Sequence, residues 1–218
     1  MNKNNKSYYA IFENKTSGKK LIYYPCPKNA NTSAKLFFAR HVGIDDKFIF
    51  LSDKIPQYQQ TKSMFQKEKK INIVSFLPSK QKFKKVFAGE KCCLVRNPIK
   101  RFISAYNNRI LYHKDKQFKN HSVDMIIEKL ESNLFENTHF LPQTYFLGND
   151  LKYYTIVANT ENIYEFEKKV NSFFDKKIKF PQIQIGGNKF NLNLDKSQLD
   201  KIKKIYTRDF NLLETLKK

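Results

Sequence analysis

The sequence predicts one α/β domain over residues 1–218, built on a central, mostly parallel sheet flanked by helices. Short apolar runs typical of buried strands alternate with segments whose apolar residues recur at helical spacing, which is the pattern of strand–helix–strand units. A chain of 218 residues suits one ordinary core, and 40% hydrophobic with 15% aromatic residues argue against global disorder. Residues 1–7 are rich in Asn and Lys and are expected to be disordered, with ordered structure beginning near Tyr8.

The first half of the chain contains two predicted strands. "KLIYY" at residues 20–24 predicts a buried strand, and a helix is expected from Thr32, after a polar loop. The helical spacing is carried by Ala34, Phe37, Phe38 and Val42. "INIVSF" at residues 71–76 predicts the second strand, and a basic stretch that could be helical or irregular continues to Gly89.

A third strand is predicted at residues 91–96, "KCCLVR", and it stops at an Asn-Pro pair. Pro98 suits the first turn of a helix, because its missing N–H would be unpaired there in any case. This helix is expected to reach about Tyr112. Its buried stripe consists of Ile99, Phe102, Ile103, Tyr106 and Ile110.

The remaining elements follow the same alternation. A helix capped by Ser122 is expected first, and then a loop with buried aromatic residues at 137–147, because Pro142 disfavours a regular element. "YYTIVA" at residues 153–158 predicts the fourth strand, and "TENIYEFEKKVNSFF" predicts the helix after it. A last helix starts at Asp195, which with Gln198 suits a capping box.

The formal net charge of +21 allows two interpretations. It is typical of a protein that binds a polyanion such as nucleic acid, acidic glycan or lipid. However, the lysines are scattered among many asparagines and isoleucines, as an AT-rich coding bias would produce. Only five residues are arginine, and Arg96, Arg101 and Arg109 cluster within fourteen residues. Arginine presents a planar fork suited to phosphate, so this cluster is more informative than the total charge.

Three cysteines, Cys26, Cys92 and Cys93, are too few and too poorly spaced for a disulfide framework or a zinc site. The first residues lack the apolar core of a signal peptide, and no apolar stretch approaches the length needed to span a bilayer. A cytoplasmic location is therefore expected.

The loop at residues 25–33 follows a predicted strand and opens a helix. The N–H groups from Asn31 to Ser33 would be unpaired donors at a positive dipole end, and Lys28 and the hydroxyls of Thr32 and Ser33 lie beside them. This arrangement favours an anion, although a Thr-capped surface helix with an incidental lysine would look the same. The Walker A pattern is absent, which disfavours nucleotide triphosphate hydrolysis.

A second loop of the same kind follows the strand at 91–96 and contains Arg96, Pro98, Arg101 and Ser104. In parallel α/β proteins, ligands bind beyond the carboxyl ends of the strands. Two anion sites at this edge suggest a ligand with two phosphates.

Four segments together resemble a known family. "PKNANTS" resembles the 5′-phosphosulfate-binding loop, and "VRNPIKRFISAY" the 3′-phosphate-binding segment, of sulfotransferases that use 3′-phosphoadenosine-5′-phosphosulfate (PAPS). "HFLPQTYFL" and "IYTRDFNLL" are similar to segments of the carbohydrate sulfotransferases of family 2. The resemblance spans about residues 21 to 213 and implies the P-loop-like sulfotransferase fold.

The resemblance implies a role for each matching residue. The 5′-phosphate and sulfate would be held by Lys28, Asn29, Ala30, Asn31, Thr32 and Ser33. Lys28 would also be catalytic, by neutralising charge on the leaving oxygen. Arg96 and Ser104 would bind the 3′-phosphate, with Arg101 in support. Asn31 stands where many members have glycine, which is acceptable because asparagine tolerates positive φ. Asn97 stands where aspartate is usual, which removes a possible charge pair with Arg101.

Sulfuryl transfer to a hydroxyl group needs a general base, and no metal ion is required. His139 matches the family's histidine before "PQ", although a histidine beside Phe140 could equally be a hydrogen-bonded structural residue. His41 and Asp53 are reserve candidates. The acceptor implied by the resemblance is a carbohydrate, which could be acidic. A bacterial enzyme acting on a cytoplasmic precursor is expected.

Two other functions stay open. A nucleic-acid or polyanion-binding protein without catalysis would explain the net charge and the basic, aromatic stretches "KSMFQKEKK" and "KQKFKKVF". It would leave the two loop motifs as coincidence. An inactive relative that binds an anionic glycan would keep the fold and lose turnover. The oligomeric state cannot be read from the sequence.

Overall fold

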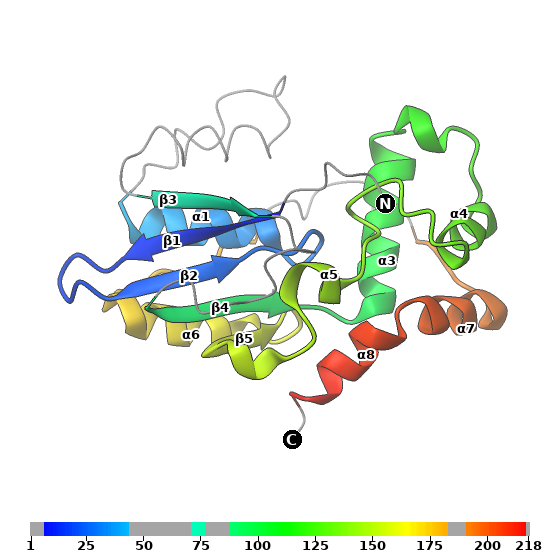
Figure 1. The fold of residues 1–218 in the computed structure, drawn as a ribbon. Helices are drawn as coiled ribbons and strands as arrows, with labels where there is room; N and C mark the ends of the chain where they lie inside the picture. The colour runs from blue at the N-terminus through cyan, green and yellow to red at the C-terminus, as the bar shows by residue number, and fades with distance from the viewer. Residues whose placement is uncertain (1–6, 44–70, 77–87, 183–190, 217–218) are drawn as a thin grey trace.

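The computed structural model describes residues 7–43, 71–76, 88–182 and 191–216. These residues form a five-stranded sheet of order β3-β1-β2-β4-β5 (Figure 1). The strands are β1 (Ser7–Glu13), β2 (Lys20–Tyr24), β3 (Ile71–Phe76), β4 (Glu90–Val95) and β5 (Ile156–Asn159). β2, β4 and β5 pair in parallel, whereas β1 pairs antiparallel with both β2 and β3. Only β1 therefore runs against the others, and the predicted mostly parallel sheet is confirmed.

Alternate residues of the central strands face two separate apolar clusters. Leu21, Tyr23, Cys92 and Leu94 pack with α1 (Asn31–His41) and α6 (Ile163–Phe174) on one face. Ile22, Tyr24, Cys93 and Val95 pack on the other face with α5 (Gln143–Leu147) and α8 (Thr207–Glu214). Helices thus cover both faces of the sheet, and this explains why β2 and β4 are continuous apolar runs rather than alternating ones.

A third apolar cluster is helical and lies beyond the carboxyl ends of the parallel strands (Figure 1). It joins α3 (Pro98–Tyr106), α4 (Val123–Glu131) and α7 (Lys196–Ile205). The stripe predicted for α3 is confirmed, since Phe102 and Tyr106 are buried and the three isoleucines pack against the cluster. The helix expected to about Tyr112 does reach that residue, but its last part, Asn107–Tyr112, is π-helical rather than α-helical.

The predicted caps are confirmed. Ser122 accepts a hydrogen bond from the backbone N–H of Met125, and Asp195 and Gln198 form both halves of a capping box. The sequence analysis expected one last helix from Asp195. The structure has two helices there, because α7 ends before Tyr206 and α8 begins at Thr207.

Other expectations need correction. Ser7, assigned to the disordered end, opens β1, a strand that was not predicted. Residues 137–147 are not all loop, since Pro142 stands at the N-cap of α5, where a fixed φ is compatible with a helix start. The fourth strand begins three residues later than predicted, after a 3₁₀ turn at Leu151–Tyr153. A second 3₁₀ turn lies at Lys116–Phe118.

Asp53 and the basic stretches at 62–70 and 80–87 lie outside the described residues.

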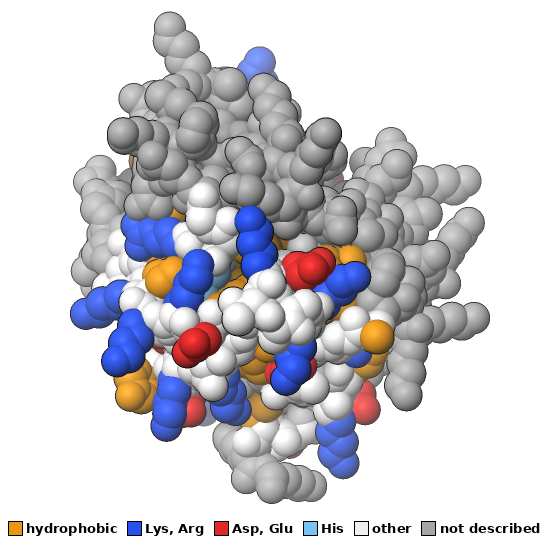
Figure 2. Space-filling view, turned by 90° about the vertical axis from the view of Figure 1, so that its left-hand side faces the viewer, with side chains coloured by type: hydrophobic (Ala, Val, Ile, Leu, Met, Phe, Trp, Pro, Cys, Tyr) orange, Lys and Arg blue, Asp and Glu red, His pale blue; other side chains and the backbone are white. Residues whose placement is uncertain are grey.

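Figure 2 shows the face at the left of Figure 1, from which the arrows of β2 and β4 point away. Over the described part of this face, basic side chains are spread among acidic, apolar and polar ones, rather than gathered into one patch.

Candidate functional site

The loop between β2 and α1 is shaped to leave the start of the helix open. Lys28 and Ala30 have φ angles of 69° and 52°, in the left-handed region that side chains rarely adopt. Ala30 is the N-cap of α1 and provides no side-chain cap. The first-turn N–H groups of α1 thus lack the usual capping oxygen, which fits an anion site and excludes the Thr-capped surface helix. A positive φ was considered for Asn31, but this residue is helical. Its side chain accepts a hydrogen bond from the Tyr23 hydroxyl at 3.3 Å.

Asn29 holds the shape of this loop. It is fully buried, and its side-chain amide donates to the Leu94 carbonyl and to Oε1 of Gln143, both at 2.7 Å. Its backbone N–H donates to the Cys26 carbonyl at 3.2 Å. All of its donors are therefore used within the protein, and the prediction that Asn29 contacts a cofactor is corrected to a structural role.

Arg96 brings the second loop to the first. It follows the last residue of β4, and its Nη1 donates to the Lys28 carbonyl at 2.9 Å. Asn97 caps α3 by accepting from the N–H groups of Ile99 and Lys100. Ser104 lies partly buried on the same helix. The two predicted anion loops thus meet at one edge of the sheet, as expected.

Arg101 lies beneath the loops. Its side chain is 1% exposed, its Nε donates to the Pro27 carbonyl at 3.0 Å, and its Nη2 is buried without a partner. Arg101 thus supports the backbone just before Lys28. Its expected part in binding the 3′-phosphate stays a prediction.

Gln143, which the sequence analysis did not single out, joins both loops to α5. Its Oε1 accepts from the Arg96 N–H at 2.9 Å as well as from Asn29, and its Nε2 donates to the Arg96 carbonyl at 2.8 Å. Asp209 of α8 in turn accepts from the N–H groups of Gln143 and Thr144 at 2.7 and 2.9 Å. Both residues are fully buried. The only signal for them in the sequence was their place in the two weaker segments of family resemblance.

Positive charge is concentrated where the loops meet. Burial, followed by the charges of Arg96, Arg109 and Arg101, lowers the pKa of Lys28 to about 8. Burial together with Arg109, Lys28 and further cations lowers the pKa of His139 to about 3. The imidazole is thus neutral at physiological pH. The same cations act on Lys28 and His139, so the predicted base lies in the field of the predicted anion site.

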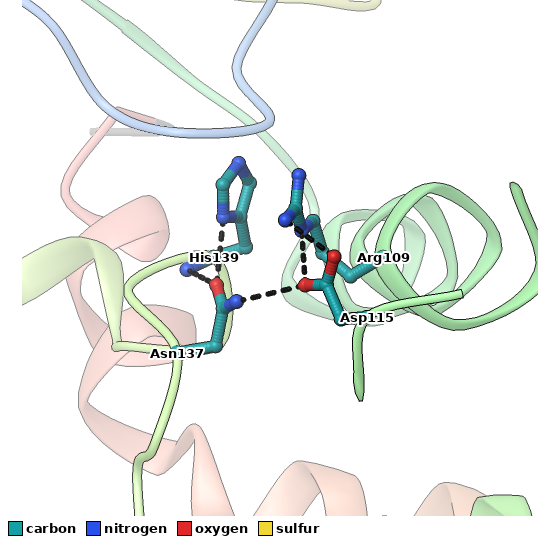
Figure 3. A network of polar contacts seen from close by, with 4 residues as sticks. All are labelled: Arg109, Asp115, Asn137 and His139. Atoms are coloured by element: carbon teal, nitrogen blue, oxygen red, sulfur yellow. Dashed lines mark hydrogen bonds and ion pairs between the residues drawn. The ribbon is translucent and has the colours of Figure 1, made fainter. Parts of the chain in front are cut away.

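His139 belongs to a network of four side chains (Figure 3). Its Nδ1 lies 2.7 Å from Oδ1 of Asn137, and the amide nitrogen of Asn137 donates to Asp115 at 3.3 Å. Arg109 of the π-helical segment forms a two-pronged ion pair with Asp115, with N–O distances of 2.7 and 2.6 Å. The sequence analysis did not predict these contacts of His139, because they depend on the fold rather than on spacing along the chain.

His41 is excluded as a base. It is 3% exposed near the end of α1, with Nδ1 2.8 Å from the Phe37 carbonyl and Nε2 2.8 Å from Oδ1 of Asn171. Phe37 and Phe174 pack against its ring. Both ring nitrogens are occupied, so this reserve candidate is a structural histidine. Asp53 lies outside the described residues.

Within the described ranges, no three His, Cys, Asp or Glu side chains are grouped so that they could hold a metal ion. The three cysteines are buried and free. Among the helices that the structure describes, none has the length and apolar character needed to cross a membrane.

The sheet, the two cationic loops at its carboxyl edge and the neutral histidine beside them define an α/β protein whose site has the charge to suit a ligand with more than one anionic group. A family model described as the sulfotransferase family, family 2, matches residues 15–214. The chain belongs to the sulfotransferase family. This confirms the resemblance seen in the sequence and makes the protein a transferase. Comparisons with curated proteins and with solved structures found no match.

Replacement of Gln143 by leucine tests whether this side chain holds the site together. The change removes the partner of the N–H and C=O groups of Arg96 and one of the two acceptors of the Asn29 amide, which keeps its bond to the Leu94 carbonyl. Each such group costs about 1–3 kcal/mol, so we expect urea unfolding to show a loss of at least about 2 kcal/mol. The same substitution at the exposed Gln117 should stay within about 0.5 kcal/mol of the unsubstituted protein. Equal stabilities of the two variants would contradict the role of Gln143.

Proposed function

We propose that this protein transfers a sulfuryl group from PAPS to a hydroxyl group of a carbohydrate acceptor. The observation that carries the proposal is the hydrogen bond from Arg96 to the Lys28 carbonyl, because it places two cationic helix-opening loops side by side. PAPS carries one phosphate on the 3′ side of its ribose and a phosphosulfate on the 5′ side. Membership of the sulfotransferase family supports this donor, and the carbohydrate acceptor rests on the resemblance to family 2.

The residues at the edge of the sheet fit such a donor. The uncapped N–H groups at the start of α1, the hydroxyls of Thr32 and Ser33 and the ammonium of Lys28 would hold the 5′-phosphosulfate. Arg96 and Ser104 would hold the 3′-phosphate. The pKa of Lys28 is depressed by burial and then by the charges of Arg96, Arg109 and Arg101, and an anionic ligand would offset the repulsion among these cations.

The proposed reaction is an in-line displacement at sulfur. The acceptor oxygen forms a bond to sulfur while the bond from sulfur to the 5′-phosphate oxygen breaks, and the hydroxyl proton passes to His139. Lys28 stabilises the charge that grows on the leaving oxygen. As in phosphoryl transfer, positioning and charge stabilisation supply most of the effect, and the base contributes about 10²–10⁴-fold.

The donor site is tested by thermal unfolding with 3′-phosphoadenosine-5′-phosphate, using AMP as the control that lacks the 3′-phosphate. A ligand at 100 times its dissociation constant stabilises by about 2.7 kcal/mol, which for a chain of this length raises the midpoint by about 5–10 °C. We expect the increase with the bisphosphate but not with AMP. Arg96→Ala should abolish it, whereas Arg208→Ala, at an exposed arginine of α8, should retain it. Equal shifts with both nucleotides, or none, would favour a polyanion-binding protein without catalysis.

The affinity for this bisphosphate should decrease at alkaline pH. In the free protein Lys28 has a pKa of about 8, and a bound anion favours the charged ammonium and raises this pKa. Above pH 8, binding then takes up a proton, and the affinity falls by at most about tenfold per pH unit until the pKa of the complex is reached. Calorimetric titrations from pH 7 to 9.5 measure this slope. Lys28→Arg, which stays charged, should remove most of it, and a flat profile in the unsubstituted protein would exclude Lys28 from the donor site.

His139→Gln tests the base. We expect sulfuryl transfer to saccharide acceptors, followed with labelled PAPS, to slow by about 10²–10⁴-fold while the thermal shift with the bisphosphate is kept. His121→Gln is the matched control, because the ring of His121 contacts the Lys119 carbonyl and the Phe118 ring, and the variant should leave the rate unchanged. An undiminished rate in His139→Gln would mean that another group accepts the proton. Donor binding without transfer to any acceptor would indicate an inactive relative.

A further inference from the structure

The orientation of the Asn137 side chain is determined by its neighbours. Asp115 is held by both prongs of Arg109 at 2.7 and 2.6 Å, so it is an ionised carboxylate and can only accept hydrogen bonds. The atom of Asn137 that lies 3.3 Å from Asp115 must therefore be its amide nitrogen. The amide oxygen then points to the other side, toward His139 (Figure 3).

This orientation determines which nitrogen of His139 carries the proton. Oδ1 of Asn137 accepts the backbone N–H of His139 at 2.9 Å and lies 2.7 Å from its Nδ1. An amide oxygen has no proton to donate, so Nδ1 must be the protonated nitrogen. A neutral imidazole has one N–H, and its Nε2 is therefore left with a free lone pair.

We propose that Asn137 is a positioning residue that holds His139 as the Nδ1–H tautomer, so that Nε2 is the atom that accepts the acceptor's proton. Arg109 and Asp115 act one step further away, by fixing which end of the Asn137 amide faces the imidazole. This assignment rests on the proposed function, because it gives His139 the role of base. The tautomer itself follows from the contacts alone and can be measured without any substrate.

An amide in this position has a different effect from a carboxylate. A carboxylate beside Nδ1 would also orient the ring, but its charge would raise the pKa of His139. The charged and titratable groups that act on His139 are Arg109, Lys28, Arg101 and His113, and all of them lower this pKa. The neutral amide orients the ring without opposing them, as the Asn does in Cys–His–Asn proteases. The basicity of His139 is thus left to respond to the charge of a bound ligand.

The first test is the tautomer of His139 in the free protein at neutral pH, measured by ¹⁵N NMR of labelled histidines, with the His139→Gln spectrum to assign the signal. We expect a protonated Nδ1 and an unprotonated Nε2. In Asn137→Ala a substantial population should carry the proton on Nε2, whereas Asn149→Ala, at an exposed asparagine, should leave the signal unchanged. A proton on Nε2 in the unsubstituted protein, or an unchanged signal in Asn137→Ala, would overturn the proposal.

The second test is the rate of sulfuryl transfer. Asn137→Ala should lower kcat by about 10–100-fold with the bisphosphate-induced thermal shift retained. Asn137→Asp combined with Asp115→Asn keeps an acceptor oxygen at Nδ1 and reverses the amide–carboxylate contact, so it should recover most of the rate and move the acidic limb of the kcat–pH profile to higher pH. Equal losses in both variants with the acidic limb unmoved would show a merely structural role. If His139→Gln keeps full activity, the assignment of the base fails, while the NMR experiment still decides the tautomer.

Discussion

The buried amide of Gln143 is the interaction on which the site depends. Polar groups lie inside the protein at Arg96, the residue after β4, in the loop before α1 and at the start of α5, and Gln143 pairs with groups of the first two at once. Asp209 adds α8 by accepting the first N–H groups of α5. Since unpaired buried polar groups cost far more than paired ones gain, this arrangement tolerates little displacement of either loop. The buried amide of Gln143 therefore fixes the separation of the two loops together with the bonds from Arg96 and Arg101 to the Lys28 and Pro27 carbonyls.

The same construction explains how like charges are kept together. Lys28, Arg96 and Arg101 all lie near the loop before α1, and the pKa of Lys28 is lowered by its burial and then by the neighbouring arginine charges. Arg96 and Arg101 each donate to a backbone oxygen, the carbonyls of Lys28 and Pro27. The carboxylate of Asp115 forms an ion pair with Arg109. Positive potential is thus maintained at the edge of the sheet, at a cost to stability that an anionic ligand would offset.

The sequence predicted those parts of the fold that depend on local patterns. Strands β2 and β3, the caps at Ser122 and Asp195 and the meeting of the two loops follow from apolar runs, capping chemistry and the geometry of parallel sheets. β1 was missed because its pairing with both β2 and β3 is a tertiary property. Asn29 was assigned to a ligand contact because burial cannot be read from motif spacing. Gln143 could not be identified as the partner of Asn29 and Arg96, since its bond to Asn29 spans 114 residues.

In the proposed reaction, donor binding would change Lys28 and His139 in complementary ways. In the free protein, burial and then the surrounding cations lower both pKa values, to about 8 and about 3, so that the imidazole is a very weak base. Negative charge bound at the loops screens these cations and raises both pKa values. A larger fraction of Lys28 is then charged, as stabilisation of the leaving oxygen requires. His139 becomes a stronger base, and Asn137 keeps its Nε2 unprotonated. Proton abstraction is therefore favoured only after the donor is in place, which gives the site an electrostatic reason to bind the donor before it activates an acceptor.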